Sequence, residues 1–410
     1  MKKLLLVLLI LSLFINHLNA NEKDLQIIQK DKKEYRLLDK ESIQTRQQSQ
    51  KYDWISPIDL SGNIGRNHSF SDENSRNLNN KNTKSASIGF TQSIFESGGI
   101  GFKMDYADNR FKYEMLSWEN QNSQLIYTIY NTLLDIKKLK LEINQNDYRI
   151  VNKDIELIIK KIQYEAGKTD IIELNNAIMS KNLILKEEIA LKNSLKEKEQ
   201  ELAKYTDLKY DEIEILDFQE TNKEIFLDKN YSILEADAKV EMLNSEYKIK
   251  KSQYLPKLSL SAKASYSNQD EKFNSMINDT NKDDASSSGS LILSMPLYDY
   301  TKSSKIQESK IEVLKQKALV NDLKNETAFE YEQIFTKIDT YLKQNETINK
   351  NIKLYEELIG ANKISSEAGM TSKYDLEILE NTKTINEFDI LINKINILQQ
   401  YAKLYFKIKN

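Results

Sequence analysis

Four short segments of the chain alternate apolar and polar residues with a period of two. The clearest is 257–267, where every even position is apolar and every odd position is Lys or Ser. A similar alternation covers 290–297, and weaker copies cover 58–64 and 86–94. Because successive side chains of a strand point to opposite faces, this pattern predicts four strands, each apolar on one side.

Helix-prone sequence fills most of the remaining chain. Between Gly99 and about Glu165 there is no proline and only Gly101 interrupts, which predicts one helix about 100 Å long at about 1.5 Å per residue. Apolar residues recur there, and near the end of the chain, at intervals of three and four. This spacing indicates coiled-coil seams. The seam residues include Ile129, Leu133, Ile136, Leu139, Ile143, Phe388, Leu391, Ile395, Leu398 and Ala402.

The same order of elements occurs twice. A constant offset of 202 aligns residues 86–208 with 288–410 without a gap, and an EAG turn sequence lies at equivalent places in both copies. Each copy is expected to contain a helix, two strands around a polar loop, a very long helix, a tight turn and a shorter helix. The predicted organisation is 1–20 signal peptide, 21–208 first repeat, 209–229 linker and 230–410 second repeat.

The repeated turn predicts two helical hairpins. Gly167 and Gly369 suit the end of a helix, where a positive φ is required and glycine adopts it at least cost. The stretches Asp170–Glu173 and Ser372–Asp375 then resemble capping boxes that begin the next helix.

The first residues indicate export from the cytoplasm. Lys2 and Lys3 precede an apolar run from Leu4 to Ile15 and a small residue, Ala20, which together are typical of a secretory signal peptide. The formal net charge of −3, close to neutral for 410 residues, argues against a nucleic-acid partner. The chain contains no cysteine, which excludes disulfides and thiolate metal sites.

Signals for enzymatic chemistry are weak. Gly167-Lys168-Thr169 resembles the end of a phosphate-binding loop, but Ile162 stands where that motif requires a glycine. His68 is the only histidine after the signal, so a histidine-based metal site or a catalytic triad is not expected. We therefore expect neither an enzyme nor a cofactor.

A membrane function would require several copies of the chain. Strands that span a membrane must form a closed barrel, and the smallest such barrels have about eight strands. Four strands per chain therefore imply either an oligomer or a soluble sheet. Aromatic residues stand at the helix-side ends of all four strands, and they either form a membrane-interface belt or cover a junction between helices and sheet. They are Trp54, Phe95, Tyr254 and Tyr298.

The residues together resemble the TolC-like outer-membrane efflux protein family. The resemblance depends on the order and duplication of the elements, on Tyr254-Leu-Pro-Lys257 entering a strand, on Met295-Pro-Leu-Tyr298-Asp299 ending one, and on Ala-Gly-X-Thr turns. It implies a mostly α protein with a small β part, a duplicated protomer that contributes four strands to a trimeric outer-membrane β-barrel and long helices to a periplasmic α-helical barrel.

The resemblance also implies function and partners. The family provides passive exit ducts for tripartite efflux or type I secretion systems. A homotrimer in outer-membrane lipid receives substrates from an inner-membrane transporter through a periplasmic adaptor protein, also called a membrane fusion protein. The alternative is a non-conducting periplasmic coiled-coil scaffold or adaptor, although adaptors carry a single hairpin where this chain has two.

Candidate site residues follow from the resemblance. By alignment on the turn glycine, Asp375 would belong to an acidic ring at the pore entrance, with Glu377 and Glu380 nearby, but a second family aspartate falls on Ile378. A plain helix cap is the competing interpretation for Asp375. The hairpin tips would contact the adaptor, or serve only as turns, through Ala166, Gly167, Lys168, Thr169, Ala368, Gly369, Met370 and Thr371.

Overall fold

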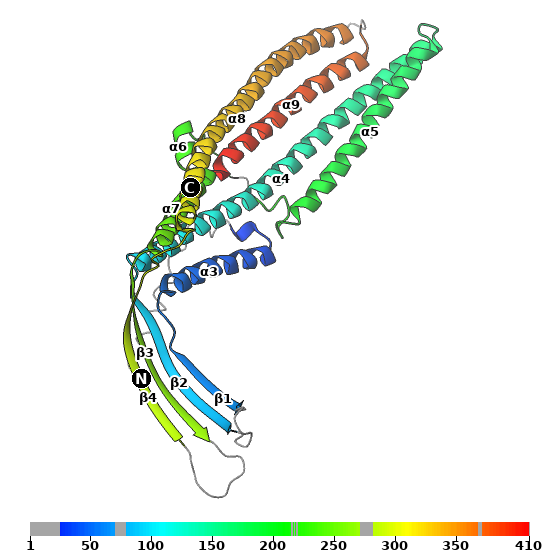
Figure 1. Cartoon of the computed structure of the whole chain (residues 1–410). Helices are drawn as coiled ribbons and strands as arrows, with labels where there is room; N and C mark the ends of the chain where they lie inside the picture. The colour runs from blue at the N-terminus through cyan, green and yellow to red at the C-terminus, as the bar shows by residue number, and fades with distance from the viewer. Residues whose placement is uncertain are drawn as a thin grey trace, which may run out of the picture. The chain divides into compact units, whose positions relative to one another are not determined.

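The strands of both repeats form one antiparallel sheet in the order β1-β2-β3-β4 (Figure 1). The strands are β1 (Asp59–Ser69), β2 (Asn79–Phe95), β3 (Lys257–Asp270) and β4 (Lys282–Ser294). The two repeats meet where β2 pairs with β3. The computed structural model describes residues 25–69, 79–214, 216, 218, 220–270, 282–367 and 371–409, so the predicted signal peptide and both polar loops lie partly or wholly outside the described residues.

The four predicted strands are confirmed, but they extend further toward the polar loops than predicted. Strand β1 continues past 64 to Ser69, β2 starts at Asn79 instead of 86, β3 continues to Asp270, and β4 starts at Lys282 instead of 290. On the helix side, β4 is shorter than predicted. Strand β4 stops at Ser294, so Met295 and Leu297 lie beyond it. Pro296 explains this end, because a proline has no amide hydrogen to extend the ladder.

Two long helical hairpins follow the strands. The first joins α4 (Gly99–Glu165) to α5 (Ile171–Leu202), and the second joins α8 (Lys302–Glu367) to α9 (Lys373–Phe406). The predicted helix from Gly99 to Glu165 is therefore confirmed over its whole length. None of the helices in the described part of the chain is apolar enough over a sufficient length to cross a membrane.

Shorter helices precede the strands or lie between the repeats. They are η2 (Leu25–Ile27), α3 (Lys30–Tyr52), α6 (Lys223–Asp228) and α7 (Tyr231–Ser252). Helix α3 comes before β1 and α7 before β3, as the duplication predicts. Helix α6 lies inside the stretch expected to be a linker.

The chain divides into two compact units. One contains the sheet and comprises residues 41–115 and 235–320, and the other comprises the described residues up to Lys40 together with 116–234 and 321–410. Each unit takes residues from both repeats, and helices α3, α4, α7 and α8 have residues in both.

In the unit with the sheet, an unusual turn starts α4. Ser97 and Gly98 both have positive φ, 51° and 88°. The Ser97 hydroxyl donates to the Pro256 carbonyl across 2.7 Å, which joins this turn to the chain entering β3. Glycine is needed at position 99 because a Cβ there would lie 2.8 Å from the Ser252 hydroxyl.

The other unit has an aromatic and aliphatic core. Phe226 of α6 is fully buried against α8 and α9, together with Ile334, Ile338, Leu404 and Ile408. A second group of rings joins the linker to α4 and α9, since Phe218 packs on Tyr130 and Phe406 at centroid distances of 6.0 and 5.6 Å. The linker is thus part of the hydrophobic core, which stabilises the crossing of the two repeats.

Candidate functional site

The sheet has one apolar face, and this face is exposed. The register places even residues of β1, β2 and β3 on the same side as odd residues of β4. Leu60 is 79% exposed, Ile64 83% and Leu293 73%. Apolar side chains this exposed indicate an interaction surface for lipid or protein. Other members of this face are Ala86, Ile88, Leu260, Ala262, Ala264, Tyr266, Ala285 and Leu291.

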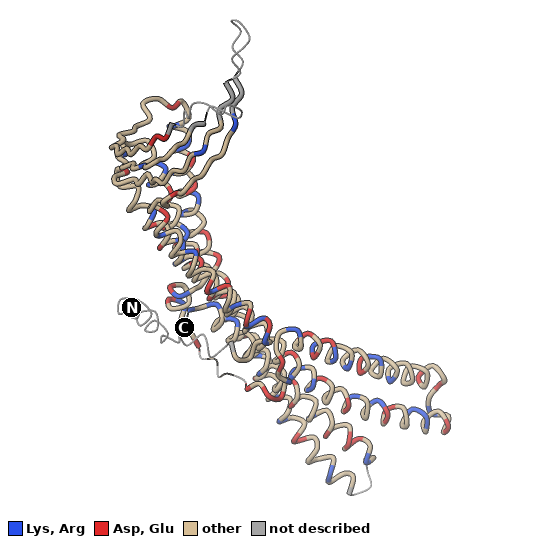
Figure 2. Tube along the Cα trace, turned by 90° about the horizontal axis from the view of Figure 1, so that it is seen from below, with Lys and Arg blue, Asp and Glu red and all other residues tan. Residues whose placement is uncertain are grey.

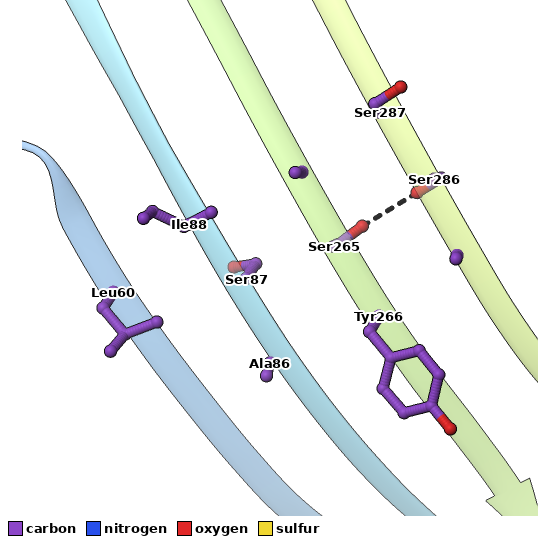
Figure 3. Close-up of a pocket in the computed structure, with 10 residues that line it drawn as sticks. Leu60, Ala86, Ser87, Ile88, Ser265, Tyr266, Ser286 and Ser287 are labelled. Atoms are coloured by element: carbon purple, nitrogen blue, oxygen red, sulfur yellow. Dashed lines mark hydrogen bonds between the residues drawn. The ribbon is translucent and has the colours of Figure 1, made fainter.

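The opposite face is a ladder of hydroxyl groups. Four pairs of side-chain oxygens lie within hydrogen-bond distance across neighbouring strands. Ser265 and Ser286 are 2.8 Å apart (Figure 3). Such cross-strand hydroxyl pairs each stabilise a sheet modestly and leave hydroxyl capacity for water. The other pairs are Ser61 with Ser87, Thr91 with Ser261, and Ser93 with Ser259.

Both edge strands lack a neighbour on one side. Within the described residues, β1 pairs only with β2 and β4 only with β3. An unpaired edge presents a row of free backbone donors and acceptors, which requires a further strand or water. The sheet is therefore equipped to continue into strands of other chains.

The four predicted interface aromatics lie at the sheet end next to the helices, but their surroundings differ. Phe95 and Tyr298 are 52% and 85% exposed, whereas Tyr254 is buried and Trp54 is half-buried. The Trp54 carbonyl accepts a hydrogen bond from the Gln92 side chain across 2.9 Å. Phe95 and Tyr298 are therefore available to a membrane interface, whereas the buried Tyr254 ring has the Lys302 ammonium 5.4 Å from its centroid.

The first hairpin tip has the predicted turn geometry. Gly167 has a φ of 69°, and the Lys168 amide donates to the Gln163 carbonyl across 2.8 Å, which satisfies a free carbonyl at the end of α4. Asp170 caps α5 by accepting from the Glu173 amide. Ala166, Gly167 and Lys168 are exposed and Thr169 is half-buried.

The second tip is described only in part. Ala368, Gly369 and Met370 lie outside the described residues, and Thr371 is half-buried. Beyond it, Ser372 and Asp375 form the predicted capping box, in which the Asp375 carboxylate accepts from the Ser372 amide at 3.3 Å.

The three predicted entrance acids have different partners. Asp375, Glu377 and Glu380 are all exposed. The Asp375 carboxylate caps α9, and Glu380 lies 3.8 Å from the Lys363 ammonium. The two roles are compatible, because Asp375 is exposed even though its carboxylate accepts from the Ser372 amide.

A set of polar contacts that the sequence did not predict joins α4 to α9. Gln145, which is buried, donates to the Asp389 carboxylate across 2.6 Å. Asn152 accepts from the Asn381 amide across 2.9 Å and donates to the Thr382 hydroxyl across 3.3 Å. The only signal in the sequence was the presence of Asn and Gln among apolar seam positions.

Positive and negative side chains are interspersed along the helices and do not form patches of one sign. Lys and Arg alternate with Asp and Glu along the helices (Figure 2). In the described residues, no group of three or more histidine or acidic side chains could hold a metal ion.

Three charged side chains form a cluster that links α8 to the end of α9. Lys403 and Lys407 lie 2.8 and 2.5 Å from the Glu330 carboxylate. Burial alone would raise the pKa of Glu330, but the hydrogen bonds from both lysines bring it below its usual value.

Comparison with known proteins gives one family and several structures. The family model of the outer membrane efflux protein matches residues 224–403. A comparison with curated proteins by sequence found no match.

Solved structures of outer-membrane proteins resemble most of the chain. The outer membrane protein VceC of Vibrio cholerae has a TM-score of 0.71 at 12% identity, and the match covers 93% of this chain and 94% of VceC. The Campylobacter jejuni CmeC outer membrane channel has a TM-score of 0.69 at 12% identity, with 92% and 84% covered. The open state of the Neisseria gonorrhoeae MtrE outer membrane channel gives 0.67 at 11%, with 94% and 87% covered. These likenesses establish the fold.

Proposed function

We propose that the chain is a member of the outer membrane efflux protein family, whose model matches residues 224–403, and that it is the exit duct of a tripartite efflux or type I secretion system. Members of this family are outer-membrane channels with helical extensions into the periplasm. One observation carries this proposal: a four-stranded sheet with an exposed apolar face, a hydroxyl-lined face and two unpaired edges.

Assembly into a trimer would give the unpaired edge strands their partners. TolC-family outer-membrane channels form trimers with efflux partners. Three copies of this chain contribute twelve strands, and pairing of β4 with β1 of the next copy closes a barrel, which satisfies all backbone groups in a membrane. The apolar face then contacts lipid and the hydroxyl ladder lines the water-filled lumen.

The apolar face is tall enough for a membrane. On β3 it extends from Leu258 to Tyr266, which is about 27 Å along the strand at about 3.4 Å per residue. With the usual strand tilt this becomes roughly 20 Å, close to the apolar band of about 25 Å in such barrels. Phe95 and Tyr298 mark its inner boundary.

The helical hairpins serve as the periplasmic part of the duct. Their long surfaces of compensated charge suit contact with water on both sides of a tube, and their tips are the contact points for an adaptor protein. Substrates arrive from an inner-membrane transporter and pass through the duct unchanged. The energy for transport is therefore supplied by that transporter.

The absence of cysteine from the sequence allows a sharp test of the lumen. Ser265 and Ala264 are neighbours in β3 that face opposite sides of the sheet. Purified Ser265→Cys and Ala264→Cys channels would be reconstituted in planar bilayers and treated with a charged, water-soluble thiol reagent. We expect single-channel conductance to fall for Ser265→Cys and to stay constant for Ala264→Cys.

The same measurement can reject the proposal. Wild-type protein without conductance would rule out a channel, and loss of conductance in the Ala264→Cys channel alone would reverse the assignment of the two faces. The wild-type chain, which has no thiol, is the control for effects of the reagent itself.

Adaptor contact at the tips needs a separate experiment. A bulky group attached to Lys168→Cys at the first tip should abolish drug resistance or protein export in cells, while the same group at Lys196→Cys, exposed on α5, should not. Equal effects at both positions would argue against contact at the tips. The kind of substrate whose export is lost would show whether the channel serves efflux or type I secretion.

A further inference from the structure

The face of the sheet with the hydroxyl ladder contains a hollow of about 420 Å³ over Gly89 of β2. Gly89 lies opposite Asp59 of β1 and opposite Lys263 of β3, so the three residues form one row across the sheet. A Cβ at position 89 would lie 3.3 Å from the Lys263 side chain and 3.0 Å from the Ala262 carbonyl oxygen. The glycine therefore leaves an open place between a carboxylate and an ammonium.

The two charged groups do not contact each other. Their Cα atoms are separated by two strand spacings, about 10 Å. Both side chains are exposed, and within the described residues neither Asp59 nor Lys263 forms an ion pair or a side-chain hydrogen bond. Each charge is therefore available to a ligand that enters the hollow.

Other charges on this face are too distant to neutralise the pair. Lys257 lies six residues from Lys263 along β3, which is about 20 Å. Asp284 of β4 lies opposite Ser267, which is four residues or about 14 Å along β3 from Lys263. Among the side chains that the structure describes on this face, these two are the next charged groups.

Hydroxyl groups border the hollow on its other two sides. The row toward the loops contains Ser61 and Ser87, whose side-chain oxygens are 2.8 Å apart. The row toward the helices contains Thr91 and Ser261, whose oxygens are 3.0 Å apart. All four residues line the hollow. Because a hydroxyl has one donor and two acceptor positions, each pair can also bind an amide group of a ligand.

We propose that this hollow binds a zwitterionic solute of about the length of a dipeptide, whose ammonium contacts Asp59 and whose carboxylate contacts Lys263. This inference depends on the proposed function, because it requires the hydroxyl face to line the lumen. An extended dipeptide is about 7 Å long at about 3.5 Å per residue, which fits between side chains with Cα atoms about 10 Å apart. Its peptide group then lies over Gly89, next to the hydroxyl pairs.

The arrangement of charges favours a solute that carries both signs. An anion at Lys263 is repelled by Asp59, and a cation at Asp59 is repelled by Lys263. A solute with one charge of each sign is attracted at both ends, whereas an uncharged solute is attracted at neither. In the trimer, three such sites line the wall that substrates pass.

Block of single-channel current by a dipeptide can test the site. Wild-type channels in planar bilayers would be exposed to glycylglycine, which is zwitterionic at neutral pH, or to N-acetylglycinamide, which is uncharged and of similar size. We expect glycylglycine to block at the lower concentration. The Asp59→Asn/Lys263→Gln channel has the net charge of wild type. Its half-blocking concentration of glycylglycine should rise about fivefold, the loss expected for two exposed charge contacts.

A matched control separates the site from general charge. The Lys257→Gln/Asp284→Asn channel also loses one charge of each sign from this face, but neither residue lines the hollow, so glycylglycine should block it like wild type. Gly89→Ala retains both charges and places a Cβ against the Lys263 side chain, so it should raise the half-blocking concentration. Equal block of wild type by both probes, or equal losses in the two double variants, would overturn the inference.

Conductance of the same preparations distinguishes this inference from the proposed function. A conducting wild-type channel whose block by glycylglycine ignores Asp59 and Lys263 refutes only the solute site. A wild-type protein that does not conduct refutes the channel itself and the solute site with it.

Discussion

The Gln145 side-chain amide of α4 donates to the Asp389 carboxylate of α9 across 2.6 Å, which links the long helix of the first repeat to the last helix of the second. The same nitrogen donates to the Ile385 carbonyl across 2.9 Å, and the amide oxygen accepts from Arg149 across 3.2 Å. All hydrogen-bonding groups of this buried side chain except one lone pair are therefore used.

We expect Gln145→Leu to lower the free energy of unfolding by about 1 to 3 kcal/mol, because Asp389 loses its donor in a partly buried place. The measurement is urea unfolding of the detergent-solubilised protein, followed by helical circular dichroism. Gln344→Leu on the exposed side of α8 is the control and should change stability by less than about 0.5 kcal/mol. Equal effects of the two variants would show that the contact between α4 and α9 adds nothing.

The lowered pKa of Glu330 predicts that the stability of the protein depends on pH. Its burial would raise the pKa, but the hydrogen bonds from Lys403 and Lys407 lower it overall. A lowered pKa contributes stability that is complete above the ordinary glutamate value of 4.5 and is lost as the pH falls through the lowered value. Glu330→Gln should thus lower the thermal midpoint at pH 7, by about 1 kcal/mol in stability, and the difference should shrink in acid.

The control for this prediction is Glu332→Gln. Glu332 pairs with Lys223 at 2.6 Å, but its side chain is 62% exposed, so its loss should have little effect at any pH. A difference between wild type and Glu330→Gln that stays constant from pH 7 to pH 3 would contradict the electrostatic explanation.

Two variants of Asp375 can separate its proposed roles as a helix cap and as an acid of the pore entrance. Asp375→Asn retains an oxygen that can accept from the Ser372 amide, so it should keep the stability of α9, whereas Asp375→Ala should cost about 1 kcal/mol. If the carboxylate also belongs to the pore entrance, both variants should weaken the block of conductance by multivalent cations. Asp170→Asn, at the cap of the first hairpin, is the control and should leave the block unchanged.

A wild-type block in Asp375→Asn channels would assign Asp375 to the cap alone. Glu377 and Glu380 would then be the remaining acids to test, and of these Glu380 is already paired with Lys363.

Gly167 and Gly101 should respond oppositely to alanine. A Cβ at either position would meet no atom within 4 Å, so contacts do not distinguish them. Gly167 has a φ of 69°, where an alanine is strained by about 1 kcal/mol, while Gly101 lies within α4, where alanine gains about 1 kcal/mol over glycine. Thermal unfolding should therefore show a lower midpoint for Gly167→Ala and a higher one for Gly101→Ala. Changes of the same sign would mean that the turn tolerates another conformation.

Local elements were predictable because their signals are local. The long interval without proline predicted α4 correctly, whereas the predicted strand 290–297 ran past Pro296, before which β4 has already ended. The turn at Gly167 and the capping box at Ser372 were predicted from a few residues each and are confirmed.

Contacts between distant elements were not predictable in the same way. Asn152 and Asn381 look like ordinary polar residues of two helices, and nothing in their neighbourhood in the sequence connects them. Phe218 lies in a stretch expected to be a linker, and only the packing of Tyr130 and Phe406 around it gives it a place in the core.

The sequence by itself predicted the four strands, the long helix from Gly99 to Glu165 and the apolar side of each strand, because these depend on spacing within a few residues. Only the tertiary structure decided that β2 pairs with β3, so that strands of both repeats share one register. That register brings Ser265 opposite Ser87 and Ala264 opposite Ile88. The physical reason is that strand pairing is chosen by backbone hydrogen bonds between segments far apart in the chain, which no periodicity within one segment can specify.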